Sequence, residues 1–153
     1  MKTTLAGLAA TAILLSIAGT AAAHCQIPCG IYGDETRFEL MLEHVQTIEK
    51  SMKQIKSLEE AEKANSNQLV RWVNNKEAHA EELSGIITYY FMAQRVKPVS
   101  MEDKEAHKKY LGEITLLHKM LIQTMKTKQT TDIEHCSELS KLIADFKQSY
   151  LGK

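Results

Sequence analysis

The chain has 153 residues, 44% of them hydrophobic, and its 19 basic residues balance 19 acidic ones. This length fits one domain with a real hydrophobic core, and the even charge balance argues against nucleic acid or an anionic membrane surface as a partner. The three cysteines cannot all be paired within one chain.

Residues 1–23 have the layout of a cleavable export signal. Lys2 precedes an uncharged stretch rich in Leu, Ile and Ala, which closes on the small residues Ala21 and Ala23. The stretch approaches the length of about 18 residues at which a membrane anchor is the alternative, but its many Ala, Gly and Thr residues favour cleavage. We therefore expect a mature chain that starts at His24, is exported to the periplasm or the extracellular space, and makes no membrane contact.

The mature N-terminus would gather metal ligands within six residues. His24 offers a free amine and an imidazole, and Cys25 and Cys29 offer two thiols. The amine, the Cys25 amide nitrogen and the Cys25 sulfur close two five-membered chelate rings, and Cys29 can return to the fourth corner of the same plane. Pro28 and Gly30 make that return bend feasible, because proline fixes φ and glycine tolerates unusual dihedrals. Such a planar set suits Ni(II) or Cu(II), whereas zinc prefers tetrahedral ligands.

The next segment predicts two helices by its apolar spacing. Steps of three and four make one stripe in a first run, and the polar residues 59–67 then interrupt the pattern. A second run ends before Pro98, because a proline disfavours helix at the preceding residue. The first stripe holds Phe38, Met41, Leu42, Val45, Ile48, Met52 and Ile55, and the second holds Leu69, Val73, Leu83, Ile87, Tyr90 and Phe91.

Two further helices follow, each with a predicted start signal. Ser100 with Asp103 resembles an N-cap with its acidic partner, and Thr131 with Glu134 has the spacing of a capping box. The third stripe holds Tyr110, Leu111, Ile114, Leu117, Leu121 and Met125, and the fourth holds Ile133, Cys136, Leu139, Ile143, Phe146 and Tyr150.

These four runs, with no strand-like alternation between them, predict an all-α fold: an antiparallel four-helix bundle over residues 34–153, preceded by a metal-binding hook at 24–32. Cys136 falls on a stripe and is expected to be a small buried hydrophobe. A di-iron site needs Glu-x-x-His on two helices, and no histidine here has a glutamate three residues before it. We therefore expect the histidines of the bundle, His44, His79, His107, His118 and His135, to be mostly solvated or capping residues.

The pattern His-Cys-x-x-Pro-Cys-Gly-x-Tyr at residues 24–32 resembles the nickel hook of nickel-containing superoxide dismutases. The helical pattern and the run Asn-Gln-Leu-Val-Arg-Trp at 67–72 are similar to that family too, so the resemblance covers essentially the whole mature chain. One departure is Gln26, where some members carry aspartate.

The resemblance implies the disproportionation of superoxide to oxygen and hydrogen peroxide by a nickel ion, one per subunit, that alternates between Ni(II) and Ni(III). Its ligands would be the amine and imidazole of His24, the amide nitrogen and thiolate of Cys25, and the thiolate of Cys29. Tyr32 would stand over the open face of the metal, order water and exclude larger molecules.

By the same resemblance, Glu39 would orient the axial imidazole and Tyr90 would lie near the channel. The family assembles as a homohexamer of four-helix bundles. Many of its members carry a short leader that a dedicated peptidase removes; a leader of that kind here would mean a cytoplasmic protein.

Three other functions are open. In a non-catalytic secreted bundle, Cys25 and Cys29 would form a disulfide, as thiols in oxidising compartments usually do. A copper site built on His24 would oxidise those neighbouring thiolates readily. A nickel chaperone would bind the metal without consuming superoxide.

Overall fold

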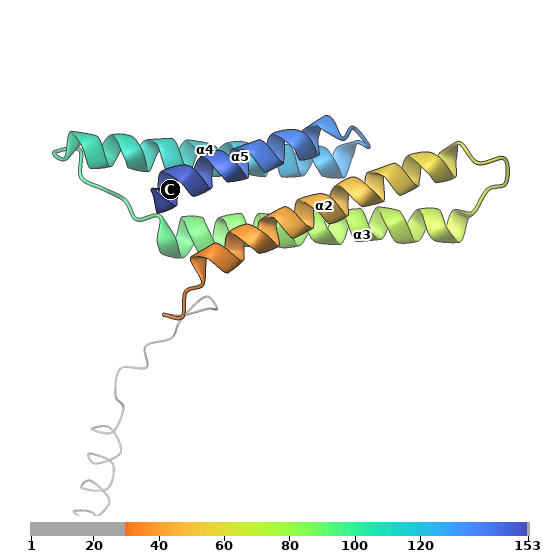
Figure 1. Cartoon of the computed structure of the whole chain (residues 1–153), viewed down its shortest axis with the longest axis horizontal. Helices are drawn as coiled ribbons and strands as arrows, with labels where there is room; N and C mark the ends of the chain where they lie inside the picture. Colours follow the sequence, from red (N-terminus) through yellow and green to blue (C-terminus); the bar gives the residue numbers. More distant parts are fainter. Residues whose placement is uncertain (1–29, 153) are drawn as a thin grey trace, which may run out of the picture. The chain divides into compact units, whose positions relative to one another are not determined.

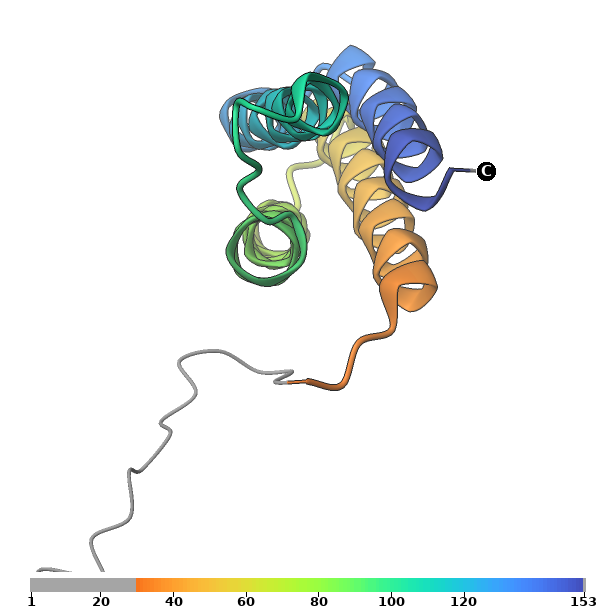
Figure 2. The same ribbon diagram turned by 90° about the vertical axis from the view of Figure 1, so that its left-hand side faces the viewer.

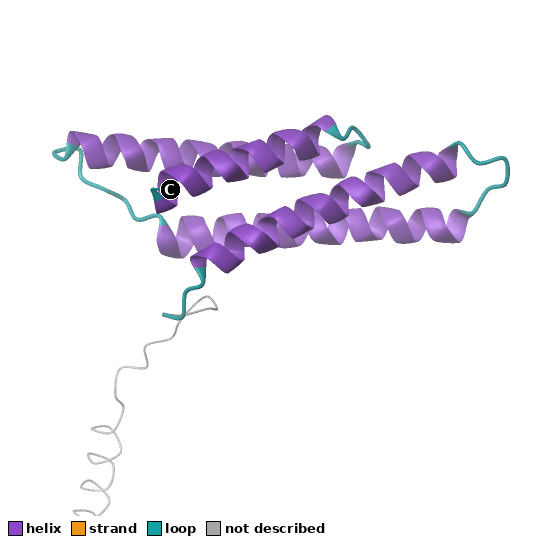
Figure 3. Cartoon of the chain, in the orientation of Figure 1, coloured by secondary structure: helices purple, strands orange, loops and turns teal. Residues whose placement is uncertain are grey.

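The structure is a computed structural model in which residues 30–152 are described, and every regular element among them is a helix (Figure 3). Four helical runs follow one another: α2 (Asp34–Glu59), α3 (Ser66–Gly85) with its continuation η1 (Ile86–Arg95), α4 (Lys104–Gln129) and α5 (Glu134–Leu151). The predicted all-α fold class is confirmed for these residues. None of the helices within 30–152 has the length and apolar character needed to cross a bilayer.

Residues 32–153 form one compact unit. Within it the helices run alternately in opposite directions (Figure 1), and the turned view shows them around a shared interior (Figure 2). α2 packs on α3 and on α5, and α4 packs on the same two helices. The helices therefore make the antiparallel bundle that the sequence predicts, while the hook at 24–32 lies almost wholly outside the described residues.

α2 buries its predicted stripe. Phe38, Met41 and Ile48 have no exposed surface, and acidic residues in the first turn with Lys56 in the last complement the helix dipole. The Phe38 ring packs against Phe91 of η1 and Phe146 of α5, with centroids 5.0 and 5.5 Å apart. Since burying a side chain of this size contributes about 1.5–3 kcal/mol, these rings fix how three helical segments meet at one end of the bundle.

The end of the second run is a π-helix rather than an α-helix. The backbone N–H of Val96 donates to the carbonyl of Phe91, five residues earlier, at 2.8 Å, which is the π pattern. η1 keeps Tyr90 and Phe91 in the core and stops at Arg95, so the predicted end before Pro98 is confirmed.

The third predicted stripe is only partly right. Leu111 and Met125 are 50% and 49% exposed, and the buried face of α4 includes Thr124 and Thr127 instead. Each threonine hydroxyl donates to a carbonyl of its own helix, at 2.8 and 2.7 Å. Burial is tolerated because these hydroxyls are satisfied, and a count of apolar residues alone misses them.

Both predicted start signals need correction. Asp103, not Ser100, caps α4, because its carboxylate accepts from the N–H of Ala106 at 3.0 Å. α5 starts at Glu134, so this residue cannot occupy the third helical position that a capping box requires. Asp132 accepts the N–H of Glu134 at 3.0 Å in its place.

Lys76 joins α3 to the end of α4. Its side chain is buried, and its Nζ donates to the carbonyls of Thr127 and Lys128 at 2.7 and 2.6 Å and to Glu77 at 3.1 Å. Carbonyls in the last turn of a helix lack partners within the helix, so the ammonium satisfies two of them and holds α3 against α4.

Candidate functional site

The described part of the site is built around the carboxylate of Asp34, the first residue of α2. The Tyr90 hydroxyl and the Arg95 Nε donate to its Oδ1 at 2.7 and 2.8 Å. The Arg95 Nη2 and the Tyr150 hydroxyl donate to Oδ2, the latter at 3.1 Å. With Tyr32, these residues are called the Asp34 cluster. One carboxylate thus joins the start of α2, the end of η1 and the end of α5.

The charges of the cluster reinforce one another. Hydrogen bonding to the Arg95 guanidinium holds the pKa of Asp34 below its usual range, against partial burial that raises it, and the Asp34 carboxylate raises the pKa of Arg95. Burial raises the pKa of Tyr90, and it raises the pKa of Tyr150 to about 12. At neutral pH the carboxylate and the guanidinium are charged and both phenols keep their protons, so every donor can be used.

Tyr32 extends the cluster toward solvent. The guanidinium carbon of Arg95 lies 4.2 Å from the centre of the Tyr32 ring, within cation–π range. The Tyr90 ring meets it edge-on, with centroids 5.9 Å apart. Tyr32 is 41% exposed, and its hydroxyl has no hydrogen-bond partner within residues 30–152. The Tyr90 and Arg95 contacts therefore hold the ring, while no residue within 30–152 occupies its partly exposed hydroxyl.

The structure unites two of the predicted site residues. Tyr32 and Tyr90 are in contact, whereas Glu39 lies on an exposed part of α2, outside the cluster. The predicted metal ligands His24, Cys25 and Cys29 lie outside the described residues. Gly30 has φ +71°, a left-handed conformation that glycine adopts without strain, directly after Cys29.

Sequence reasoning missed Asp34, Arg95 and Tyr150. A signal for the first two was present, because Asp34 opens the first helix and Arg95 ends the second, and consecutive antiparallel helices bring those two positions to one end of the bundle. Tyr150 was assigned to the core, yet its hydroxyl reaches a carboxylate 116 residues earlier.

The prediction that the bundle histidines are mostly solvated or capping residues is wrong for His44 and His79. His44 is buried, and its Nδ1 lies 2.9 Å from the Nδ1 of His79. His79 and Glu82 have the order His-x-x-Glu, the reverse of the pattern that the di-iron test requires. His118 is exposed, as predicted.

Cys136 has the predicted character. It is a free, buried thiol whose Sγ lies 3.8 Å from the Met52 sulfur. Burial raises its pKa to about 11, so the thiol stays protonated and is a poor metal ligand.

The family model described as nickel-containing superoxide dismutase matches this chain over residues 19–153. The match spans the segment 24–32 and all four helical runs. No curated protein and no solved structure matches the chain.

Proposed function

The chain belongs to the nickel-containing superoxide dismutase family and is a nickel-dependent oxidoreductase that disproportionates superoxide, and we propose that His24, Cys25 and Cys29 bind its nickel once residues 1–23 are removed. The observation that carries this proposal is the family match across the segment that contains all three residues. Membership also favours turnover over the non-catalytic bundle, the copper site and the nickel chaperone.

The donor set fits nickel. An amine, a backbone amide nitrogen, an imidazole and two thiolates are available within six residues, and nitrogen donors in a plane suit Ni(II). When bound, nickel supplies one-electron chemistry between Ni(II) and Ni(III), which the electron-rich thiolates bring into reach. Cys136 is excluded from the set by its burial and its protonated thiol.

Tyr32 is the described residue best placed to act on substrate. It follows Cys29 by three residues, and since a chain spans at most about 3.6 Å per residue, their Cα atoms are within about 11 Å of each other. Two superoxide ions and two protons give one oxygen and one hydrogen peroxide. The partly exposed Tyr32 hydroxyl, which no residue within 30–152 engages, would hold water or the anion by hydrogen bonding, while Arg95 and Tyr90 keep its ring in place.

Glu39 as the residue that orients the His24 imidazole remains part of this proposal. Its carboxylate is exposed on α2 and thus free to accept a hydrogen bond. A positioning role of this kind would tune the imidazole rather than touch the substrate.

Self-association is proposed as well, as the homohexamer that the family resemblance implies. Leu111, Ile122 and Met125 are 50%, 37% and 49% exposed, and their spacing of eleven and three residues puts them on one outer face of α4. This face is the candidate for subunit contacts, since contiguous exposed apolar patches mark association surfaces. Export to the periplasm or the extracellular space follows if residues 1–23 act as a signal peptide, and a cytoplasmic location follows if they act as a propeptide.

The test compares four nickel-reconstituted proteins: the chain that starts at His24, the same chain with one alanine added before His24, Cys29→Ser and Cys136→Ser. We expect the extended chain and Cys29→Ser to lose superoxide consumption and the paramagnetic resonance signal of Ni(III). Cys136→Ser should keep both. Circular dichroism checks that all four are helical. Full activity of the folded, extended chain would refute the ligand assignment.

A further inference from the structure

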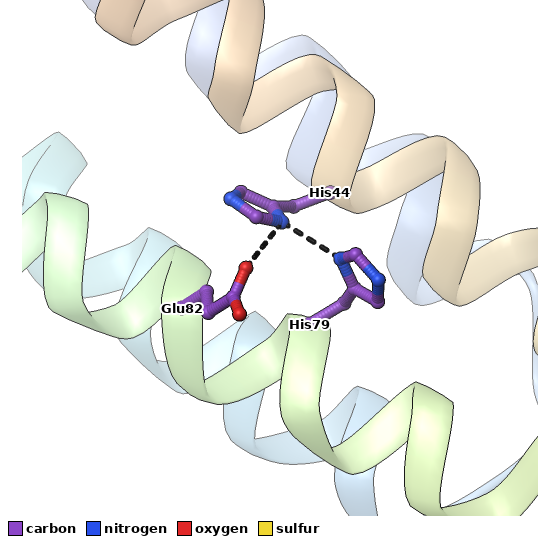
Figure 4. Close-up of side chains that lie close together, drawn as sticks. All are labelled: His44, His79 and Glu82. Carbon is purple, nitrogen blue, oxygen red and sulfur yellow. Dashed lines mark hydrogen bonds and ion pairs between the residues drawn. The ribbon is translucent and has the colours of Figure 1, made fainter.

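A second group of metal ligands lies where α2 packs against α3. His44 projects from α2, and His79 and Glu82 project from α3 one turn apart toward it (Figure 4). The Nδ1 of His44 lies 2.9 Å from the Nδ1 of His79 and 3.5 Å from the Glu82 Oε2. One ligand atom from each of the three residues lies within 4.8 Å of the other two. This set is called the His44 triad.

The spacing suits a tetrahedral ion. Zinc binds imidazole nitrogen and carboxylate oxygen at about 2.0–2.2 Å, so two ligands of a tetrahedral site are about 3.3–3.6 Å apart. The distance from His44 to Glu82, 3.5 Å, falls within that range, and the distance from His44 to His79, 2.9 Å, is shorter. A small ion could thus enter without any large movement of the helices.

The surroundings of His44 favour its neutral form, which is the form that binds a metal. Burial lowers the pKa of His44, and nearby His79 lowers it further, while Glu82 and Glu43 act in the opposite direction. In the hydrogen bond between the two Nδ1 atoms, one ring carries the shared proton; that ring can bind a metal ion through Nδ1 once its proton is carried on Nε2 instead. The Glu82 side chain is 63% exposed, which leaves a path for the ion and room for water.

We propose that His44, His79 and Glu82 bind one zinc-type divalent ion, with water as the fourth ligand, and that this ion clamps α2 to α3. The donors also separate this site from the nickel site. Two imidazoles and a carboxylate without thiolate are a zinc-type set, and His₂Glu with an open position is an established zinc arrangement. The triad lies on the bundle and shares no residue with segment 24–32.

The test uses the mature, nickel-loaded protein, so that the nickel ligands are already occupied. Zn²⁺ is titrated against a competing indicator dye for the wild type, His79→Gln, Glu82→Gln and the control His118→Gln, whose imidazole is exposed on α4. Elemental analysis after the titration checks that nickel stays bound. Thermal unfolding with and without Zn²⁺ provides a second measurement.

We expect the wild type and His118→Gln to bind one Zn²⁺ per chain and to melt at a higher temperature with it. Both triad variants should bind Zn²⁺ at least about tenfold more weakly, because losing even a residue that only hydrogen-bonds to a metal ligand lowers affinity about 10–100-fold. Zn²⁺ should not raise the melting temperature of either variant. Equal binding by all four proteins would place the ion at another site. No binding by the wild type would mean that the triad is only a hydrogen bond between His44 and His79 beside an ion pair between His44 and Glu82. Either result overturns the proposal without affecting the dismutase assignment.

Discussion

Replacing Asp34 with asparagine tests the central role of its carboxylate. The asparagine side chain would keep one oxygen acceptor, but it would lose the negative charge and put an amide donor opposite the donors that now meet Oδ2. Hydrogen bonds to charged groups contribute about 1.5–3 kcal/mol each, and Arg95 makes two of them with Asp34.

The size of the loss follows from burial. The Asp34 and Arg95 side chains are 19% and 26% exposed, so the loss should fall below the 3–5 kcal/mol of a fully buried broken pair. We expect Asp34→Asn to lower the free energy of unfolding by about 2–3 kcal/mol at pH 7, which lowers Tm by roughly 10 °C in a chain of this size. Asp145→Asn is the matched control, because Asp145 is exposed on α5.

The pH dependence gives a sharper check. The pKa of Asp34 is lowered in the folded protein, so its contribution is fully present above the unfolded pKa of about 4 and is lost as pH falls through the folded value. The stability gap between wild type and Asp34→Asn should therefore shrink between about pH 5 and pH 2. Urea unfolding at one fixed chain concentration measures it. A gap that is the same at every pH, or no larger than that of Asp145→Asn, would refute the reasoning.

Three further outcomes are expected. Lys76→Met should lower the free energy of unfolding, measured in urea, by about 2 kcal/mol, because two carbonyls of α4 lose a charged donor. The control Lys53→Met, at a lysine that is 58% exposed, should lower it by less than about 0.5 kcal/mol. Equal losses would contradict the capping role of Lys76. Cys136→Ser should cost about 1–2 kcal/mol, since it buries a hydroxyl, and leave the nickel content by elemental analysis unchanged; a loss of nickel would make Cys136 a ligand. Met125→Lys should reduce the mass measured by light scattering if the outer face of α4 is an association surface, and an unchanged mass would exclude that face.

Helix positions were largely predictable from the sequence because local spacing determines them. The stripe from Phe38 to Ile55 repeats every three or four residues, and Pro98 stops the second helix by its own geometry. The third stripe failed where local spacing is ambiguous. α4 carries apolar residues on two faces, and only packing decides that Leu117 is buried while Leu111 is exposed.

The candidate site was predictable only where chemistry is concentrated in one short segment. The ligand pattern at 24–32 is local, so the sequence displays it, and Tyr32 follows from it. Asp34 and Arg95 meet across 61 residues, and that contact depends on which helix ends come together. The His44 triad was missed for the same reason, since His44 and His79 are 35 residues apart. The search for Glu-x-x-His also did not cover the reverse order found in α3.

The hydrogen bond between Tyr150 and Asp34 has a practical consequence for handling this protein. Only three residues would separate this phenol from a purification handle fused after Lys153, and a handle fused before His24 would block the proposed amine ligand. The turn at residues 60–65 is exposed and lies at the opposite end of the bundle from the C-terminus (Figure 1). Loop tips of this kind tolerate insertions, so an affinity peptide or a fluorophore is best introduced there.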